Sequence, residues 1–232
     1  MRYAVLGTGV VGRTIAAKLA SLGHEVVIGT RDPKATLART EPDGYGNPPF
    51  SNWLAGNEQV RLETFADAAA WGESVVNTTA GVGTLQALDA AGAANLASKI
   101  LIDIANPLDF SHGMPPSLTP VNTDSLGEQI QRAFPEVKVV KTLNTMNCQI
   151  MVEPARVAGE HTVFVSGDDT DAKKAVTGLL VSFGWPETAV IDLGTIETAR
   201  STEMLLPIWL RLWDTLGHAD FNFHIAGAPS GA

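Results

Sequence analysis

The sequence predicts an α/β protein with a doubly wound, mostly parallel sheet of the Rossmann type and a smaller C-terminal α/β lobe. Two observations favour this class. Residues 1–32 read as a strand, a glycine-rich turn, a helix and a second strand. After them, short apolar runs alternate with segments of helical periodicity along most of the chain, as expected for parallel strands joined by crossover helices.

The first strand–turn–helix–strand unit is the clearest signal in the chain. An uncharged apolar run at residues 3–6 is followed at once by the turn Gly7-Thr8-Gly9-Val10-Val11-Gly12. Apolar side chains recur at helical spacing over residues 13–22, Gly23 stands where a helix end favours a left-handed residue, and residues 25–29 form the next strand. A G-x-G-x-x-G motif in this setting indicates a dinucleotide-binding site, with a glycine-rich turn of some other α/β protein as the alternative.

Each glycine of the motif has a physical purpose in such a site. Gly7 allows a tight turn off the strand, Gly9 leaves space for a pyrophosphate to approach the backbone, and Gly12 lets the helix pack closely on the strand. The N-terminus of the helix supplies N–H donors and the positive end of a dipole. We therefore predict that all six motif residues bind the cofactor.

The end of the second predicted strand favours NADP over NAD. An NAD-selective site places an acidic residue there, but this chain has the neutral Thr30 followed by Arg31. A hydroxyl and a guanidinium suit a 2′-phosphate, and Thr8 in the glycine turn could add a second hydroxyl. Asp32 lies within the usual spacing for a ribose-binding acid and keeps NAD open. A capped turn into the next helix is the structural alternative.

Composition narrows the class of protein. The chain has 232 residues, of which 45% are hydrophobic, enough for a globular core. Its net charge of −9, without a basic cluster, argues against nucleic acid as a partner. The single cysteine, Cys148, cannot form an internal disulfide and is expected to be buried in a protein of a reducing compartment. No segment approaches ~18 uninterrupted apolar residues, so we expect a cytoplasmic protein with no membrane span.

The predicted order of elements continues after the second strand. A short helix at residues 34–39 precedes a Pro- and Gly-rich loop at 41–57 that contains Tyr45, Phe50 and Trp53. This loop reads as a surface loop held by its own aromatic side chains, with a lid beside the adenosine end of the cofactor as the alternative. The further expected elements are strands at 60–65, 74–79, 100–104 and 137–143, helices at 66–72, 84–97 and 126–134, a loop at 110–120, and Asp124 or Ser125 as a helix N-cap.

Polar turns follow three of these strands, and ligands of doubly wound sheets bind at the carboxyl ends of the strands. We therefore expect Thr79, Ala80, Gly81 and Val82 to lie near the pyrophosphate or the nicotinamide ribose, joined by Asn106 and Pro107. Asn144, Thr145 and Met146 would form the far wall of the nicotinamide and acceptor cleft. For Asn106 the alternative is a turn-forming Asn before Pro.

The pattern changes near residue 150, so we assign residues 1–148 to a dinucleotide-binding domain and residues 149–232 to a smaller lobe for substrate placement or oligomerisation. Expected there are strands at 162–166, 189–193 and 221–225, a helix at 172–183, and a long helix at 195–216 kinked by Pro207. Asp168, Asp169 and Asp171 read as caps and surface charge rather than a calcium loop. Apolar residues around the second half of the long helix predict burial against the first domain, another subunit or both, hence a homodimer or higher oligomer.

Four stretches resemble the NADP oxidoreductases that use the deazaflavin coenzyme F(420) and their bacterial relatives: residues 7–12, 23–31, 143–146 and 200–210. The first half is also similar to the cytosolic domain of the six-transmembrane metalloreductases. This resemblance implies that Thr8, Thr30 and Arg31 hold the 2′-phosphate, with Lys34 about one residue short of the family's lysine. It also implies that the late lobe places a second redox partner. Asn144 stands where the deazaflavin enzymes carry His, which leaves a flavin or a ferric chelate open.

The main functional hypothesis is therefore an NADPH-dependent oxidoreductase that passes hydride directly to a second planar acceptor. Such a transfer depends on positioning more than on an acid or base, which fits the absence of an evident catalytic set. His24, His112 and His161 read as structural. The alternatives are a dehydrogenase of a small carbonyl or imine, with Lys141, Asn144 or His112 as proton donor, and a dinucleotide-sensing protein without turnover.

Overall fold

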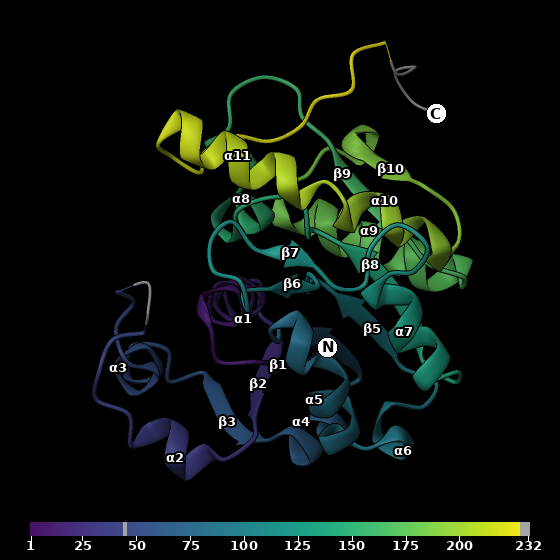
Figure 1. Cartoon of the computed structure of the whole chain (residues 1–232). Helices are drawn as coiled ribbons and strands as arrows, with labels where there is room; N and C mark the ends of the chain where they lie inside the picture. Colours follow the sequence, from purple (N-terminus) through teal and green to yellow (C-terminus); the bar gives the residue numbers. More distant parts are fainter. Residues whose placement is uncertain (44–45, 228–232) are drawn as a thin grey trace.

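The computed structural model describes residues 1–43 and 46–227 and is organised around one eight-stranded sheet (Figure 1). The strand order is β10-β9-β8-β5-β4-β1-β2-β3, and every neighbouring pair is parallel except β8 and β9. The strands are β1 (Arg2–Leu6), β2 (Glu25–Thr30), β3 (Val60–Thr64), β4 (Ser74–Asn77), β5 (Ile100–Asp103), β8 (Lys138–Thr142), β9 (Val163–Ser166) and β10 (Val190–Asp192). This topology confirms the predicted α/β class with a mostly parallel sheet.

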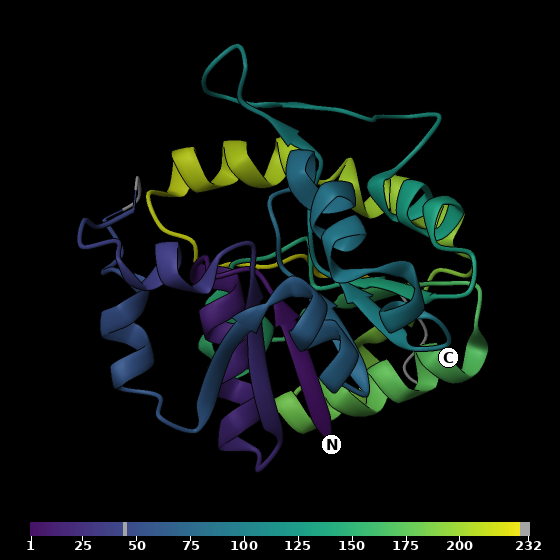
Figure 2. The same cartoon turned by 90° about the horizontal axis from the view of Figure 1, so that it is seen from below.

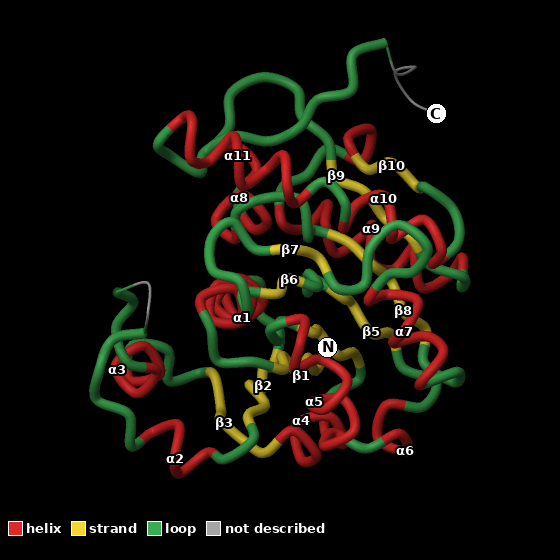
Figure 3. The backbone as a smooth tube through the Cα atoms, viewed as in Figure 1, coloured by secondary structure: helices red, strands yellow, loops and turns green. Residues whose placement is uncertain are grey.

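Helices cover both faces of the sheet (Figure 3). The helices are α1 (Val10–Ser21), α2 (Pro33–Leu37), α3 (Phe50–Ala55), α4 (Phe65–Trp71), α5 (Thr84–Ala91), α6 (Ala93–Leu96), α7 (Leu126–Ala133), α8 (Cys148–Val152), α9 (Thr170–Phe183), α10 (Ala199–Glu203) and α11 (Leu206–Leu216). In Figure 2 the purple α1 and the green α9 lie on one side of the sheet. Side chains of each strand alternate between two apolar cores, so Val5 packs toward α1 while Ala4 and Leu6 pack toward α4 and α5.

The strands of residues 149–232 extend the sheet of the first part beyond β8 rather than forming a separate one. The antiparallel contact between β8 and β9 marks the point where the sequence pattern changes. The division into two domains at residue 148 stays a prediction. None of the described helices is both long enough and apolar enough to cross a membrane.

The first helix ends as its sequence predicts. Gly23 has a φ of 81°, its N–H donates to the carbonyl of Ala20, and the N–H of His24 donates to the carbonyl of Leu19. This pair of bonds satisfies carbonyls that the helix end would otherwise leave open. The predicted left-handed glycine is thus confirmed.

Two predicted segments contain more regular structure than expected. The loop at 41–57 includes α3, where Phe50 is buried and packs against Trp53 in a tilted arrangement with 5.5 Å between ring centroids. Tyr45 lies outside the described residues. The loop at 110–120 belongs to a small hairpin of β6 (Leu108–Asp109) and β7 (Ser117–Leu118). Both were missed because the elements are short and have no hydrophobic period.

Three predicted elements of the chain were wrong in form. The helix at 84–97 is divided into α5 and α6 at Gly92, whose φ of 89° is incompatible with a continuous helix. The segment at 221–225 forms no strand, although the carbonyl of Phe223 accepts a hydrogen bond from the N–H of Thr162. The long helix at 195–216 is instead a 3₁₀ turn (Ile196–Thr198), α10 and α11, because Pro207 occupies the first turn of α11, where no N–H is needed.

In the single chain α11 is largely exposed, so its predicted burial against another subunit stays a prediction. Only Leu206 of this helix is buried, whereas Ile208, Trp213 and Leu216 are 46%, 41% and 48% exposed. Trp209 stacks on Trp213 at 6.2 Å between ring centroids. Apolar residues of this helix therefore lie on the outside of the single chain. The helix itself is the yellow ribbon labelled α11 in Figure 1.

The acidic turn before α9 acts as predicted. Asp169 caps α9 by accepting a hydrogen bond from the N–H of Ala172 at 2.8 Å, and Asp168 accepts one from the N–H of Ile196 at 3.0 Å. In the part of the chain that the structure describes, no group of acidic, His or Cys residues is arranged to hold a metal ion. Both carboxylates therefore organise backbone N–H groups.

Candidate functional site

The glycine turn has the close packing that the motif predicts. Gly7 has a φ of 124°, and its N–H donates to the carbonyl of Gly29 at 3.0 Å, which turns the chain off β1. A Cβ at Gly12 would lie 2.2 Å from the carbonyl oxygen of Gly7 and 2.8 Å from Oγ1 of Thr78. Any side chain at Gly12 would therefore push α1 away from the end of the sheet.

Gly9 differs from its neighbours because it is open. A Cβ built at Gly9 would meet nothing within 4 Å. Gly9 is also the N-cap residue of α1, with no side chain capping the helix and no acidic residue in its first turn. The first N–H groups of α1 are thus available to an anion, and this arrangement fits the pyrophosphate of a dinucleotide.

Three neighbouring residues at the end of β2 have different surroundings. Asp32 caps α2 by accepting a hydrogen bond from the N–H of Ala35 at 3.0 Å, so the capped turn considered from the sequence is present. Thr30 is buried, and its Oγ1 lies 3.0 Å from Oγ1 of Thr36, a partner that the sequence did not reveal. Arg31 is exposed and, within the described chain, forms no hydrogen bond or ion pair. The carboxylate is engaged and the guanidinium is available.

A cavity of about 550 Å³ opens beside the glycine turn. Its lining includes Thr8, Gly9, Thr36, Arg39 and residues 40–43 and 48–50, so the loop at 41–57 forms one of its walls. Lys34 is exposed on α2 and does not line this cavity. Arg39 does line it, and sequence reasoning missed this residue because nothing local marks a cation after α2 as part of a site.

Arg13 of α1 attaches the loop to the glycine turn. Its Nε donates to the carbonyl of Thr8 at 2.9 Å and its Nη1 donates to the carbonyl of Pro48 at 2.6 Å. The guanidinium also lies 5.5 Å from the ring centroid of Phe50. Arg13 thus holds the loop together with the aromatic pair Phe50 and Trp53, and the loop borders the cavity beside the glycine turn.

The turns after β4 and β5 are in direct contact. A Cβ at Gly81 would lie 2.0 Å from the carbonyl oxygen of Asn106, so only glycine allows this approach. Oγ1 of Thr79 donates to Oδ1 of Asn77 at 2.7 Å and lies 2.8 Å from Oγ1 of Thr84. Val82 is 70% exposed at the tip of the turn. The structure thus brings together the residues predicted at the carboxyl ends of these strands.

The turn after β8 reaches the same place. Nδ2 of Asn106 donates to the carbonyl of Asn144 at 2.8 Å, and Nδ2 of Asn144 donates to Oδ1 of Asn106 at 2.9 Å. Leu143, just before this pair, has a φ of 61°, a strained conformation for a branched residue. Thr145 and Met146 are buried in the core beneath the turn. Of the three residues predicted as the far wall, Asn144 is the one whose side chain hydrogen-bonds the turn after β5 among the described residues.

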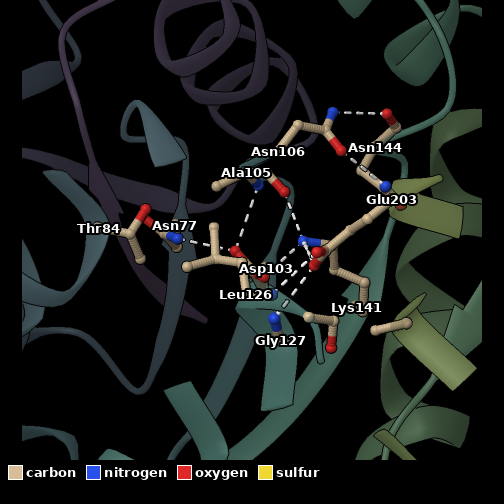
Figure 4. A network of polar contacts seen from close by, with 12 residues as sticks. Asn77, Thr84, Asp103, Ala105, Asn106, Leu126, Gly127, Lys141, Asn144 and Glu203 are labelled. Atoms are coloured by element: carbon tan, nitrogen blue, oxygen red, sulfur yellow. Dashed lines mark hydrogen bonds and ion pairs between the residues drawn. The ribbon is translucent and has the colours of Figure 1, made fainter. Parts of the chain in front are cut away.

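A buried charge network lies under these turns (Figure 4). The side chain of Lys141 is 0% exposed, and its Nζ lies 2.8 Å from Oδ2 of Asp103 and 2.8 Å from Oε1 of Glu203. Burial alone would lower the pKa of Lys141, but the two carboxylates outweigh this effect and raise it. A buried ammonium held in this way has no path to a substrate, which argues against the proton-donor role considered for Lys141.

Among the remaining candidates from the sequence, His24, His161 and Cys148 have structural surroundings, and His112 is exposed. His24 packs edge-on against Tyr3 at 5.1 Å between ring centroids. A ring nitrogen of His161 lies 3.0 Å from the carbonyl oxygen of Pro154. His112 is exposed on the connection between β6 and β7. Cys148 is buried, and burial raises the pKa of its thiol, so a thiolate nucleophile is disfavoured.

Comparison with known proteins identifies the family. The family model described as NADP oxidoreductase, coenzyme F(420)-dependent, matches residues 2–107, which contain the glycine turn and the turns after β4 and β5. A crystal structure from Arthrobacter sp. FB24, provisionally named an F(420)-dependent NADP-reductase, is 66% identical, covers 97% of this chain and 99% of its own, and has a TM-score of 0.92. The chain belongs to this family. The resemblance drawn from the sequence is confirmed, and the protein is an NADP-dependent oxidoreductase.

Two further proteins are less similar to this chain. The metalloreductase STEAP3 of Rattus norvegicus is 26% identical over 212 residues, which is 90% of this chain and 38% of that protein. The chain therefore spans well under half the length of this curated relative. A reductive aminase from Aspergillus terreus in complex with NADPH4, cyclohexanone and allyl amine is 16% identical with a TM-score of 0.62, covers 94% of this chain and 64% of its own, and shares the fold.

Proposed function

We propose that this family member passes hydride between NADP(H) and a second planar redox acceptor, a deazaflavin, a flavin or a ferric chelate. The observation that carries the proposal is the open N-terminus of α1 at Gly9, which follows β1, together with the unengaged guanidinium of Arg31, which follows the neighbouring parallel strand β2. A pyrophosphate and a 2′-phosphate need these two features side by side. NAD remains the second choice, and the engagement of Asp32 in capping α2 supports NADP.

Within this proposal, the described residues bind and orient the cofactor. The motif residues 7–12 hold the pyrophosphate, and Thr8, Thr30, Arg31 and Lys34 hold the adenosine end. The residues proposed along the rest of the cofactor are Thr79, Ala80, Gly81, Val82, Asn106 and Pro107. When bound, NADPH supplies a hydride, and no side chain has to move a proton for that step.

The acceptor is proposed from the cleft and from the relatives. The Asn106–Asn144 pair presents neutral amides at the expected nicotinamide edge, and in the described chain neither residue has a charged partner. Neutral walls suit an uncharged ring system stacked on the nicotinamide. The relatives are named for F(420) and for metal reduction, so both acceptors belong in the test. Hydride carries two electrons and each ferric ion accepts one, so one NADPH would reduce two ferric chelates and release one proton.

The cofactor part of the proposal is tested by calorimetry with NADPH and NADH on wild type and Arg31→Ala. Loss of one charge-assisted contact, about 1.5–3 kcal/mol, should weaken NADPH binding more than tenfold and leave NADH binding nearly unchanged. Lys174→Ala is the matched control, because it removes a cation whose side chain is 76% exposed on α9. An Arg31→Ala variant with NADPH affinity within about twofold of wild type would rule out Arg31 as the phosphate ligand.

The acceptor part is tested by NADPH consumption with F(420), with FMN and with ferric citrate, each added separately. Turnover with one of them identifies the class of acceptor. Tight NADPH binding without consumption in any of the three mixtures would instead favour the dinucleotide-sensing alternative. Turnover only with a small carbonyl or imine would replace the proposal by the dehydrogenase alternative.

The apolar surface of α11 supports the expected homo-oligomer. Ile208, Trp213 and Leu216 are exposed on one helix, and a second copy of the chain is the occupant that we propose. Light scattering on wild type and Trp213→Glu tests this, with a monomeric wild type as the contrary result. A cytoplasmic location is proposed from the single buried thiol.

A further inference from the structure

Lys141 has a fully buried ammonium group that the proposed hydride transfer does not use. Its ammonium is enclosed with two carboxylates, those of Asp103 and Glu203. Removing three charges from water is unfavourable, and apolar side chains of similar volume would often be as stable. The network therefore needs a reason other than stability.

One contact of the network is with the backbone of Ala105, the residue directly before Asn106. Nζ of Lys141 donates to the carbonyl of Ala105, and the N–H of Ala105 donates to Oδ1 of Asp103 at 3.2 Å. Both backbone polar groups of Ala105 are thus held by the same ion pair (Figure 4). Asp103 also accepts a hydrogen bond from Nδ2 of Asn77 at 2.7 Å, which joins the end of β4.

The second contact joins the late part of the chain to the same ammonium. The carboxylate of Glu203, at the end of α10, accepts hydrogen bonds from the N–H groups of Leu126 at 2.9 Å and Gly127 at 3.1 Å. These are orphan donors at the positive end of α7, which helps to balance the excess negative charge of the network. Lys141 therefore links the ends of β5 and β8 to α7 and α10.

We propose that Lys141 is a positioning residue for the nicotinamide half of the cofactor. By holding the backbone of Ala105, it sets the position of Asn106 and, through the side-chain pair, of Asn144. Thr8, Thr30 and Arg31, which we propose for the adenosine half, make no hydrogen bond or ion pair with this network in the described chain. This inference rests on the proposed function, since it concerns the same dinucleotide, and it adds a residue that touches neither cofactor nor acceptor.

The test compares two ligands on one variant of the full chain. NADPH and 2′,5′-ADP share the adenosine half, but only NADPH carries a nicotinamide. For Lys141→Met, calorimetry should show NADPH binding weakened by about tenfold or more, and 2′,5′-ADP binding changed by less than about twofold. The emission of bound NADPH should also move toward that of free NADPH, because the dihydronicotinamide is no longer held.

The matched control is Lys173→Met. Lys173 is also buried, and its Nζ bonds a carboxylate, Asp192, at 2.8 Å and a carbonyl, that of Gly194, at 2.9 Å. It lies at α9 and β10, away from the Asn106 turn. Thermal melts should show a loss of stability for both lysine variants, whereas only Lys141→Met should change the ratio of the two affinities.

Glu203→Gln provides a second variant. It keeps the side-chain size and removes the charge of one of the two carboxylates that pair with Lys141, so Lys141 and Asp103 together have no net charge. It should show the same selective loss for NADPH to a smaller extent, and it decides the question if Lys141→Met does not fold. Equal losses for both ligands, or wild-type NADPH binding in a folded variant, would overturn the positioning role. A wild type that binds neither ligand would instead refute the proposed function.

Discussion

The sharpest prediction concerns the contrast between Gly9 and Gly12. Both belong to the glycine turn, but a Cβ at Gly9 meets nothing within 4 Å, whereas one at Gly12 lies 2.2 Å from a backbone oxygen. Gly9 has a φ of −70° and a ψ of 178°, which any L-residue can adopt. Gly9→Ala should therefore leave the free protein folded and act only when a pyrophosphate approaches. Gly12→Ala should act on the fold itself.

The magnitudes follow from these distances. At Gly9, alanine is a poorer N-cap than glycine, which lowers the free energy of unfolding. Alanine also reduces the conformational entropy of the unfolded chain, which raises the free energy of unfolding by about 0.4–1 kcal/mol, so the two effects largely cancel. At Gly12, overpacking should lower the free energy of unfolding by about 1–3 kcal/mol. For binding, a methyl group at Gly9 displaces the phosphate from one N–H donor, about 1.5–3 kcal/mol, which weakens NADPH binding between about tenfold and a hundredfold.

The assay is urea unfolding of both variants together with calorimetry of NADPH. Gly9→Ala should unfold at nearly the wild-type urea concentration and bind NADPH weakly, and Gly12→Ala should unfold earlier. Wild-type NADPH affinity in a folded Gly9→Ala protein would show that no phosphate lies over Gly9. The reasoning from open space to a binding surface would then be wrong.

Three other predictions follow from single contacts. Asp32→Ala should lower the free energy of unfolding by about 0.5–2 kcal/mol, because the α2 cap is lost. The variant should bind NADH with unchanged affinity. A large loss of NADH affinity would instead assign Asp32 to the ribose. Cys148→Ala should retain NADPH oxidation within about twofold, since a buried neutral thiol has no catalytic task, and loss of turnover in a stable variant would contradict this. The hydrogen bonds from Arg132 lower the pKa of Asp124, so their stabilisation is present above the unfolded pKa and is lost as the pH falls through the lower folded value. The stability difference between wild type and Arg132→Ala should thus shrink below about pH 4, and a difference that grows in acid would refute the assignment.

Much of the fold could be predicted because its signals are local. The strand at residues 3–6, the glycine turn and the left-handed Gly23 each follow from a few neighbouring residues, and the structure places them as expected. Boundaries were less predictable where one residue changes the backbone direction, as at Gly92. The apolar residues of α11 predicted burial, yet periodicity shows only that a surface is apolar and not what covers it.

In the candidate site, the positions of the turns could be predicted from the sequence, but the contacts between their side chains could not. The turns after β4, β5 and β8 could be predicted as ligand-facing, because parallel strands bring their carboxyl ends to one edge. Which side chains of those turns meet could not be predicted. The Asn106–Asn144 pair joins residues 38 positions apart, and the buried Thr145 and Met146 follow Asn144 directly.

By itself, the sequence determined the Rossmann unit, the presence of Thr30 and Arg31 after the second strand, and the family to which the chain belongs, since motif spacing and residue type are sufficient for these. Only the tertiary structure decided that Asp32 is engaged as a cap, that Arg13 attaches the 41–57 loop to the glycine turn, and that Lys141 lies between two carboxylates. The physical reason is that an ion pair depends on distance in space. Asp103, Lys141 and Glu203 belong to three segments that only the order of strands and the packing of α10 bring within 2.8 Å.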